Sequence, residues 1–288
     1  LALGAVGSNN VIIHRGTITG DGPANAGIGI GGNAGETVIV GSGDEVLSAG
    51  EITLTGPESA AIIMASDNGK LQVTAPIIST GADGFGLVGF GQGLEFDLDA
   101  DLTVGAGTAV QFGAERFNII FDLSGTPARD NVLAVGGNVR ALTPDGSTFF
   151  DGLGSNIRIT NEGREITGFG TGFSLTQAAG LGFFRLTNET GGSVSADSMF
   201  DVTANEVQIT NNPEASFQAE DLGMLGSVTK LELQNDGTID AGNTGLTVTA
   251  FEDPVDYTVI NTGDIAAGSG TTLNFGAEDM EGGTQSVT

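Results

Sequence analysis

Cysteine and tryptophan are both absent from the chain. Disulfide bonds and thiolate metal sites are therefore excluded, and so are tryptophan platforms for stacking sugars. A single histidine, His14, excludes a zinc site built from several histidines. His14 would also have to serve in any Ser-His-Asp triad, and no nucleophile motif of the G-x-S-x-G kind occurs. We expect His14 to have a structural role or to lie on the surface.

Basic residues are scarce, because 9 Lys and Arg stand against 36 Asp and Glu, a formal net charge of -27. Nucleic acids and anionic membranes are recognised by clusters of Lys and Arg, so neither is expected as a partner. No apolar stretch approaches the roughly 20 residues that span a bilayer, so we expect no membrane insertion of this segment. The chain starts at Leu1 without a basic region before an apolar run, which predicts a removed targeting segment or a longer parent protein.

Long runs with helical periodicity are also missing, and 49 glycines divide the sequence into short segments. Five segments of the second half instead alternate apolar and polar residues before an asparagine: IRITN (157–161), FRLTN (184–188), VQITN (207–211), LELQN (231–235) and YTVIN (257–261). Alternation with period 2 is typical of a half-buried strand. A second short strand follows each asparagine, and a third follows in most units. This repeat predicts one rung of a parallel β-solenoid.

We therefore predict an all-β fold, a single-stranded right-handed parallel β-helix with three strands per rung of about 25 residues. The predicted inward columns are Ile157, Phe184, Val207, Leu231 and Tyr257, and Ile159, Leu186, Ile209, Leu233 and Val259. An antiparallel sandwich of short strands is the competing architecture, but it does not require matching residues at one place in every repeat.

The solenoid is expected to be continuous over residues 1–288. We expect irregular rungs with lateral loops over 1–156, regular rungs over 157–277 and a C-terminal tail or cap over 278–288. In the first half, the segments 16–19, 50–56 and 68–74 resemble the second strands of the later repeats.

The repeated asparagine predicts a structural ladder at one corner of the solenoid. Asparagine tolerates the left-handed backbone of a sharp corner, and its amide can bond along the stack. The predicted ladder contains Asn161, Asn188, Asn211, Asn235 and Asn261. The alternative is that asparagine is simply common in turns.

The turns N-x-G-x-I at 235–239 and 261–265, together with repeats made only of strands, resemble the right-handed β-helices of bacterial autotransporter passengers and related haemagglutinin-like surface proteins. The resemblance covers residues 157–277 well and the first half loosely. It implies a secreted, non-enzymatic protein that is extracellular or lies on the outer cell surface, as a structural or adhesive scaffold. Its partner would be a second copy, associated end to end or laterally into a filament, or a ligand on a host or neighbouring cell.

The strongest charged motif is LEFDLDADLTV (94–104), in which four carboxylates alternate with apolar residues. On one strand, next-nearest side chains lie about 6.6 to 7 Å apart, which suits Ca²⁺ shared with a neighbouring rung. The predicted metal ligands are Glu95, Asp97, Asp99 and Asp101. A solvated acidic strand face that prevents lateral aggregation is the alternative. No other cofactor is expected.

Two other functions stay open. Parallel β-helices also carry polysaccharide lyases and glycosidases, which use pairs of Asp or Glu. In the predicted register, Arg158 and Arg185 would point outward on adjacent rungs, either as an acidic-glycan site or as an ordinary surface column. The next outward column would contain Thr160, Thr187, Thr210 and Gln234. A calcium-dependent coat or matrix protein is the second alternative.

Overall fold

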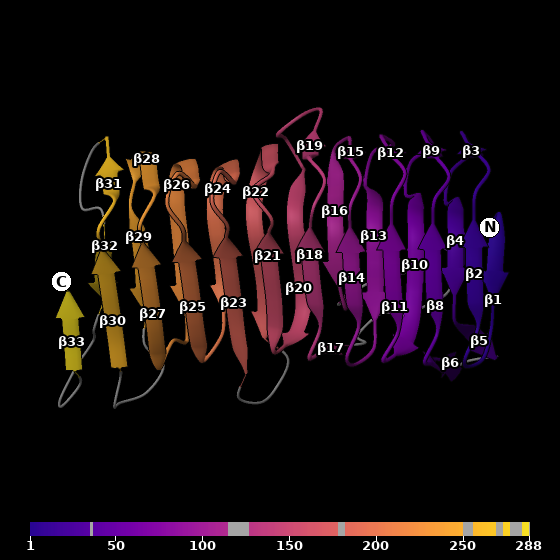
Figure 1. The fold of residues 1–288 in the computed structure, drawn as a ribbon, viewed down its shortest axis with the longest axis horizontal. Helices are drawn as coiled ribbons and strands as arrows, with labels where there is room; N and C mark the ends of the chain where they lie inside the picture. Colours follow the sequence, from indigo (N-terminus) through magenta and orange to yellow (C-terminus); the bar gives the residue numbers. More distant parts are fainter. Residues whose placement is uncertain are drawn as a thin grey trace.

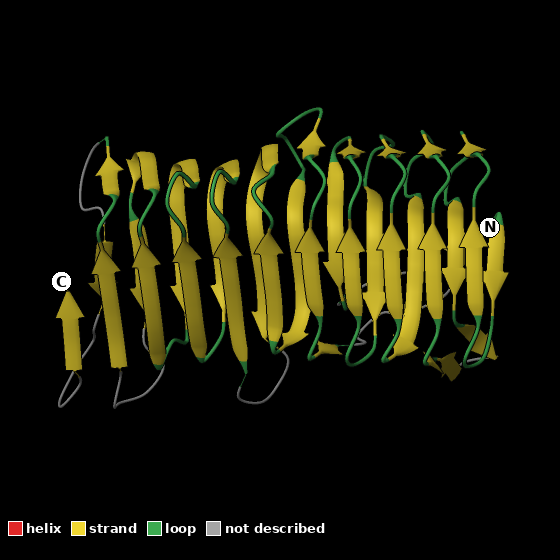
Figure 2. Ribbon diagram, in the orientation of Figure 1, coloured by secondary structure: helices red, strands yellow, loops and turns green. Residues whose placement is uncertain are grey.

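The chain folds into a rod of stacked parallel strands (Figure 1). The computed structural model describes residues 1–34, 37–114, 127–177, 182–249, 256–268, 273–276 and 284–287. Within these ranges all regular secondary structure is β-strand (Figure 2). These residues contain no helix long and apolar enough to cross a membrane. The predicted parallel β-solenoid is confirmed.

One face of the rod is an 11-stranded sheet, and its neighbouring strands are parallel. From the N-terminal end, its strands are β2 (Val11–His14), β8 (Glu45–Ser48), β11 (Lys70–Val73), β14 (Glu95–Leu98), β18 (Val132–Val135), β21 (Ile157–Asn161), β23 (Phe183–Asn188), β25 (Glu206–Asn211), β27 (Lys230–Asn235), β30 (Asp256–Asn261) and β33 (Thr284–Val287). Glu45, Lys70 and Glu95 share one register position, which corresponds to turns of about 25 residues. We call this sheet the ladder face, because its strands end at the corner that carries the asparagines.

The other two faces belong to a 20-stranded sheet. The second face is formed in order by β3 (Ile18–Gly20), β9 (Ile52–Leu54), β12 (Ile77–Ser79), β15 (Leu102–Val104), β19 (Val139–Ala141), β22 (Glu165–Gln177), β24 (Ser193–Thr203), β26 (Ser216–Gly226), β28 (Thr238–Thr244) and β31 (Asp264–Ala267). The third face is formed by β1 (Leu3–Ala5), β4 (Ala26–Ile30), β10 (Ala60–Asp67), β13 (Gly84–Phe90), β16 (Gly107–Phe112), β20 (Thr148–Ser155), then again β22, β24 and β26, and finally β29 (Leu246–Thr249) and β32 (Leu273–Gly276). The long strands β22, β24 and β26 serve both faces, since β22 pairs with β19 and also with β20.

A few short strands lie beside this stack. β5 (Gly32–Ala34) and β6 (Thr37–Ile39) form an antiparallel hairpin. β7 (Gly41–Ser42) pairs with β10, and β17 (Ala128–Arg129) pairs with β20, both in parallel.

The core fills the inside of the rod with columns of apolar side chains. Both predicted columns of the second half are in register: Ile157, Phe184, Val207, Leu231 and Tyr257, and Ile159, Leu186, Ile209, Leu233 and Val259. The second column continues into the first half through Leu133, Phe96, Leu71 and Val46, all buried. Burying such a side chain contributes roughly 1.5 to 3 kcal/mol, so the stacked columns hold successive turns together.

A second apolar cluster is buried on the other side of the third face, in the first half of the rod. It consists of Ala26, Ala60, Ile63, Ala65, Val88, Phe90 and Ala114. Ile63 and Ala65 alternate along β10 with Ile62 and Met64 of the main core, and side chains of a strand alternate between its two faces. This part of the third face is therefore buried on both sides.

The predicted backbone role of asparagine at the corner is wrong, since none of the five ladder asparagines has a positive φ. Left-handed residues lie instead at the opposite end of the same face, two positions before a strand. Asn9, Asn68 and Asp130 have φ of 56°, 53° and 56°, and Gly43 and Gly93 occupy the equivalent places with φ of 65° and 70°. The first half has a second left-handed corner that leads into the third face, where Ala24 and Glu58 have φ of 51° and 53° two positions before β4 and β10.

One strand assignment also needs correction. Residues 68–74 resemble second strands by sequence, but Lys70–Val73 is β11 of the ladder face. The first-half strands of that face end in Val73, Leu98 and Val135 at the place later taken by Asn161. Without an asparagine, the corner that marks the repeat is not visible in the sequence.

Candidate functional surface

The ladder asparagines are bonded to one another along the rod. Asn161 Nδ2 donates to Asn188 Oδ1 at 2.9 Å, Asn188 Nδ2 to Asn211 Oδ1 at 2.9 Å, Asn211 Nδ2 to Asn235 Oδ1 at 2.7 Å, and Asn235 Nδ2 to Asn261 Oδ1 at 2.7 Å. The first four side chains are fully buried, and Asn261 is half-buried.

Each ladder amide also donates to the turn that follows it. Asn161 Nδ2 donates to Arg164 O at 2.8 Å, while Asn161 Oδ1 accepts from Arg164 N at 3.0 Å. Asn211 Nδ2 donates to Ala215 O at 3.3 Å and to Thr238 O at 3.1 Å. Buried polar groups are costly unless they are bonded in this way. The asparagines are thus used for structure and are not available to a ligand.

The same corner position in the first two strands of the ladder face is held by His14 and Ser48. His14 Nδ1 lies 3.2 Å from Ser48 Oγ, and burial lowers the pKa of His14. The imidazole Nε2 is buried without a hydrogen-bond partner in the described part of the chain. This placement fits the structural role expected for the histidine.

The four predicted calcium ligands are divided between one strand and the corner that follows it. Glu95 and Asp97 lie on β14, whereas Asp99 follows that strand and Asp101 precedes β15. Their partners differ. Glu95 pairs with Lys70 Nζ at 3.0 Å, Asp99 Oδ2 accepts from Gln72 Nε2 at 3.2 Å, and Asp101 Oδ1 accepts from Asn138 N at 3.0 Å. Within the described ranges, no three Asp, Glu or His side chains are grouped so that they could hold a metal ion. Calcium binding at these residues stays a prediction.

The register brings Glu162, from the corner after β21, toward two of these carboxylates. Burial raises the pKa of Asp97, and the like charges of Asp99 and Glu162 raise it further. A β-carbon on Gly136 would lie 3.0 Å from Asp99 Oδ1 and 3.2 Å from Glu162 Oε2, so both carboxylates approach the same backbone segment. Glu162 could not be found from the motif 94–104, because only the stacking of turns places it there.

We expect Asp97→Asn to raise the melting temperature at neutral pH by about 1 to 2 °C. Because the pKa of Asp97 is raised in the folded protein, the folded state takes up this proton more readily than the unfolded chain. The Asp97 carboxyl group therefore contributes to the stability of the folded protein at acidic pH, and this contribution is lost as pH rises through its raised pKa. The difference between variant and wild type should shrink as pH falls, in melting curves recorded over a pH series.

Asp240→Asn is the charge-matched control for this substitution, since Asp240 is exposed on β28. An equal gain from Asp240→Asn would show that net charge alone is responsible. Adding Ca²⁺ tests the predicted metal site in the same melts, because bound calcium would stabilise the wild type and not Asp97→Asn.

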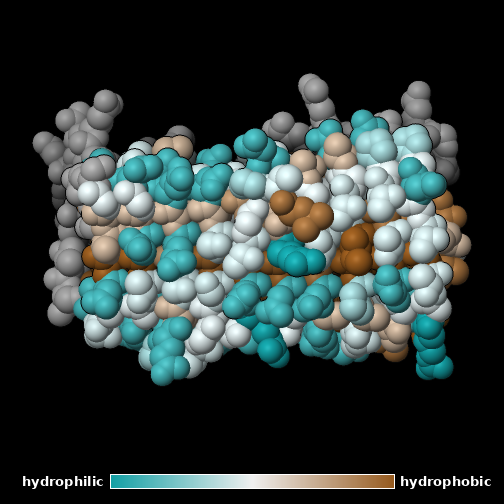
Figure 3. Space-filling model, turned by 90° about the horizontal axis from the view of Figure 1, so that it is seen from above, coloured by the Kyte–Doolittle hydropathy of each residue, from teal (hydrophilic) through white to brown (hydrophobic). Residues whose placement is uncertain are grey.

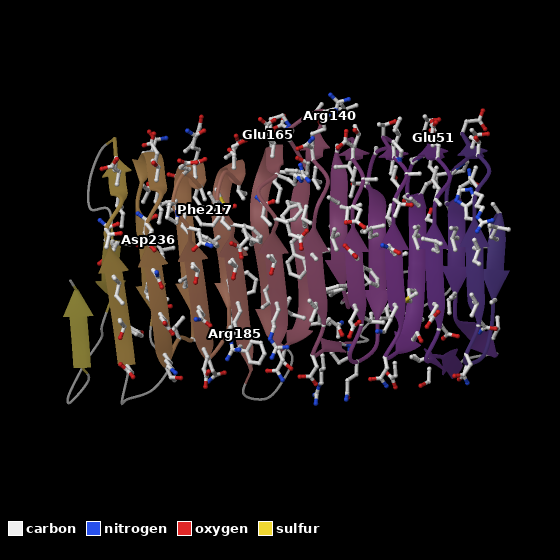
Figure 4. All side chains as sticks on the ribbon, in the orientation of Figure 1. Glu51, Arg140, Glu165, Arg185, Phe217 and Asp236 are labelled. Atoms are coloured by element: carbon white, nitrogen blue, oxygen red, sulfur yellow. The ribbon has the colours of Figure 1, made fainter. Side chains whose placement is uncertain are left out.

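The outward side chains of the ladder face form two columns that run along the rod. Arg158 and Arg185 are direct neighbours on β21 and β23, and the column continues through Gln208 and Glu232. The next column contains Thr160, Thr187, Thr210 and Gln234. In Figure 4, Arg185 lies on β23 near the end of the strand opposite its arrowhead.

An open hollow of about 450 Å³ lies on the same face toward its N-terminal end. Val11, Ile13 and Leu47 line its apolar part, and the Lys70–Glu95 ion pair lines its charged part. Val11 and Ile13 are 64% and 54% exposed. The hollow therefore presents uncovered apolar surface at one end of the rod.

The candidate functional surface is thus the outward side of the ladder face. It combines the polar columns of the second half with the apolar hollow near the N-terminal end. Comparison of the chain with protein-family models, with curated proteins and with solved structures gave no match.

Proposed function

We propose that this chain is a structural, non-enzymatic β-solenoid that works on the outer cell surface as a rigid scaffold with a repetitive adhesive surface. The observation that carries the proposal is the 11-stranded ladder face, which runs along the rod with its outward positions in register. Each turn packs on its neighbours, so bending the rod breaks ladder hydrogen bonds and core contacts together. The resemblance to autotransporter passengers and haemagglutinin-like proteins supports the location.

The adhesive part of the proposal is supported by repetition on the outward side. Thr160, Thr187 and Thr210 lie on neighbouring parallel strands, and such strands are spaced about 4.7 to 4.9 Å apart. Equivalent groups at fixed spacing allow several weak contacts to act together, which raises the overall affinity for a repetitive partner.

End-to-end association into a filament belongs to the same proposal. β1, β2 and β3 are the first strands of the three faces, and an unpaired strand edge is a template for pairing with another chain. Large apolar side chains are exposed at this end: Leu1, Leu3, Val6, Val11 and Ile13. Figure 3 shows hydrophobic residues at the right-hand end of the rod, where the chain begins. A head-to-tail contact of this kind does not close on itself and therefore builds a filament.

A calcium-dependent coat or matrix protein is the second candidate, favoured by the approach of Asp99 and Glu162 to the same backbone segment at Gly136. In that case calcium would link or rigidify neighbouring rods. The calcium melts of the wild type and Asp97→Asn distinguish this candidate from a scaffold that needs no metal.

Electron microscopy of the purified chain tests the rigid rod and its end-to-end association. We expect straight rods in salt that screens the net charge, and filaments as the protein concentration rises. Replacing Leu1 and Leu3 together with lysine should leave the rods intact and abolish the filaments, because Leu3 is in register with core Ile28 at the exposed edge of the first turn and two charges would then be buried at the contact.

Leu142→Lys is the matched control, because Leu142 is 55% exposed but lies between β19 and β20, away from the ends. Filaments that persist in the double variant, or rods that never associate, would contradict end-to-end growth. Globular or irregular particles in place of rods would contradict the scaffold itself.

A further inference from the structure

Two arginines of the ladder face are neighbours and lack a carboxylate partner. Arg158 and Arg185 are in direct register on β21 and β23. In the described part of the chain, neither guanidinium forms an ion pair or donates a hydrogen bond, although carboxylates outnumber basic groups fourfold in the sequence. Like charges on adjacent strands repel each other.

An aromatic ring holds both guanidinium groups in place. Arg158 Cζ lies 4.7 Å and Arg185 Cζ 4.3 Å from the ring centroid of Phe183, at the start of β23. A cation over an aromatic face at this distance is attracted by the ring. The contact with the ring face uses none of the guanidinium N–H groups, so these donors stay available for an oxyanion.

Neutral hydroxyl groups lie beside the two arginines. Thr160 and Thr187 are two residues further along the same strands, on the same side, and are again in register. Two cationic donor groups and two hydroxyls thus form a two-by-two array that spans adjacent strands. The sequence repeats it as Arg-x-Thr at 158–160 and 185–187.

We infer that this array, Arg158, Arg185, Thr160 and Thr187 around Phe183, is a binding site for a short saccharide that carries a carboxylate. The arginines bind the carboxylate with charge-assisted hydrogen bonds, and the threonine hydroxyls bind sugar hydroxyl groups. The inference names the ligand class of the proposed adhesive surface, and it rests on that proposal only for the biological use of binding.

The surroundings of the array favour a short saccharide over a long polyanion or a second copy of the chain. A small hollow of about 50 Å³ adjoins the array and is lined by Phe183 and Arg185 together with Glu206, Lys230 and Glu232. Its two carboxylates against one further cation make the surface beyond Arg185 less favourable for an anionic polymer that continues along the rod. A second copy would bring a net charge of -27 with its carboxylates, whereas a short acidic saccharide brings only a few charges.

Titration calorimetry with trigalacturonate at low salt tests the inference. The wild type should bind it, and Arg158→Gln with Arg185→Gln should weaken binding at least about 10-fold, because each arginine supplies charged hydrogen bonds. The lysine pair Arg158→Lys with Arg185→Lys keeps the charge but loses the fork geometry, so it should bind with intermediate affinity. Maltotriose, which has the hydroxyl groups but no carboxylate, should not bind.

Arg140→Gln with Arg164→Gln is the charge-matched control, since both arginines are exposed and lie outside the array. Its affinity for trigalacturonate should stay within about 2-fold of the wild type.

The inference would be overturned if the wild type did not bind, if maltotriose bound equally well, or if both glutamine pairs lost the same affinity. If the Arg158/Arg185 pair alters only self-association, the array is a contact between copies and the saccharide assignment is wrong. Rods that form without binding trigalacturonate would leave the scaffold standing, so the two failures are distinguishable.

Discussion

Replacing Asn211 with aspartate is expected to lower the free energy of unfolding by about 3 to 5 kcal/mol, the range found when a buried charge loses its partner. Asn211 Nδ2 donates to three oxygens, those of Ala215, Thr238 and the Asn235 side chain. In the variant, a carboxylate oxygen would face these three acceptors in a fully buried corner. No donor would then remain for them on residue 211.

Denaturant unfolding followed by circular dichroism measures this loss, and hydrogen exchange locates it. Exchange should accelerate most in β23, β25 and β27, because each turn contacts mainly its neighbours. The loss should be smaller at acidic pH, where the buried carboxyl is protonated and uncharged. Asn205→Asp is the control with the same change in charge, since Asn205 is half-buried just before the same strand and lies outside the ladder. Equal losses for the two variants would contradict a specific role of the ladder.

Replacing Phe173 with alanine is expected to cost about 3 to 5 kcal/mol, as for other large-to-small changes in protein cores. Phe173 is fully buried, and its ring lies 5.4 Å from that of Phe149, 5.7 Å from that of Phe200 and 6.0 Å from that of Phe184. Removing the ring opens a cavity between turns whose backbones are fixed by ladder hydrogen bonds. The neighbouring side chains can therefore collapse into it only in part.

Phe183→Ala is the matched control for this loss, because Phe183 is half-buried on the outer side of the ladder face. Its removal should cost no more than about 1 kcal/mol, chiefly the attraction between its ring and the two arginines. A thermal or denaturant melt of the two variants compares them directly. A Phe173→Ala protein as stable as Phe183→Ala would show that the core is not packed as the ring distances indicate.

The second half of the fold could be predicted from the sequence because local and stacking patterns agree there. From 157 to 161 and in the four later repeats, alternation defines the strand and the final asparagine defines its end, so the inward columns and the Arg158–Arg185 pair follow. The φ values of the asparagines did not follow, since their bonding along the stack, and not a left-handed backbone, accounts for their position.

The first half was harder because three of its ladder-face strands end in apolar residues and its corners carry no single repeated residue type. A β-carbon on Gly81 would overlap the carbonyl oxygen of Gly56 in the neighbouring turn, so this corner needs glycine for close approach. Glycine is common throughout the chain, so the sequence does not distinguish a glycine that such a close approach requires from the other glycines. The acidic segment 94–104 forms two strands and not one, because the alternation that suggested a single strand continues through the corner after Leu98. Burial on the outer side of β10 depends on distant segments, which no local pattern encodes.

The asparagine ladder also gives the rod a direction. In all four bonds between ladder asparagines, the amide N–H of one turn donates to the amide oxygen of the next turn. The amide dipoles therefore add along the axis, and each hydrogen bond polarises the next. The turn before Asn161 already belongs to the rod and places Val135 at this position, so the ladder could be extended only beyond Asn261. The ladder therefore gives the second half of the rod one direction that the first half does not share.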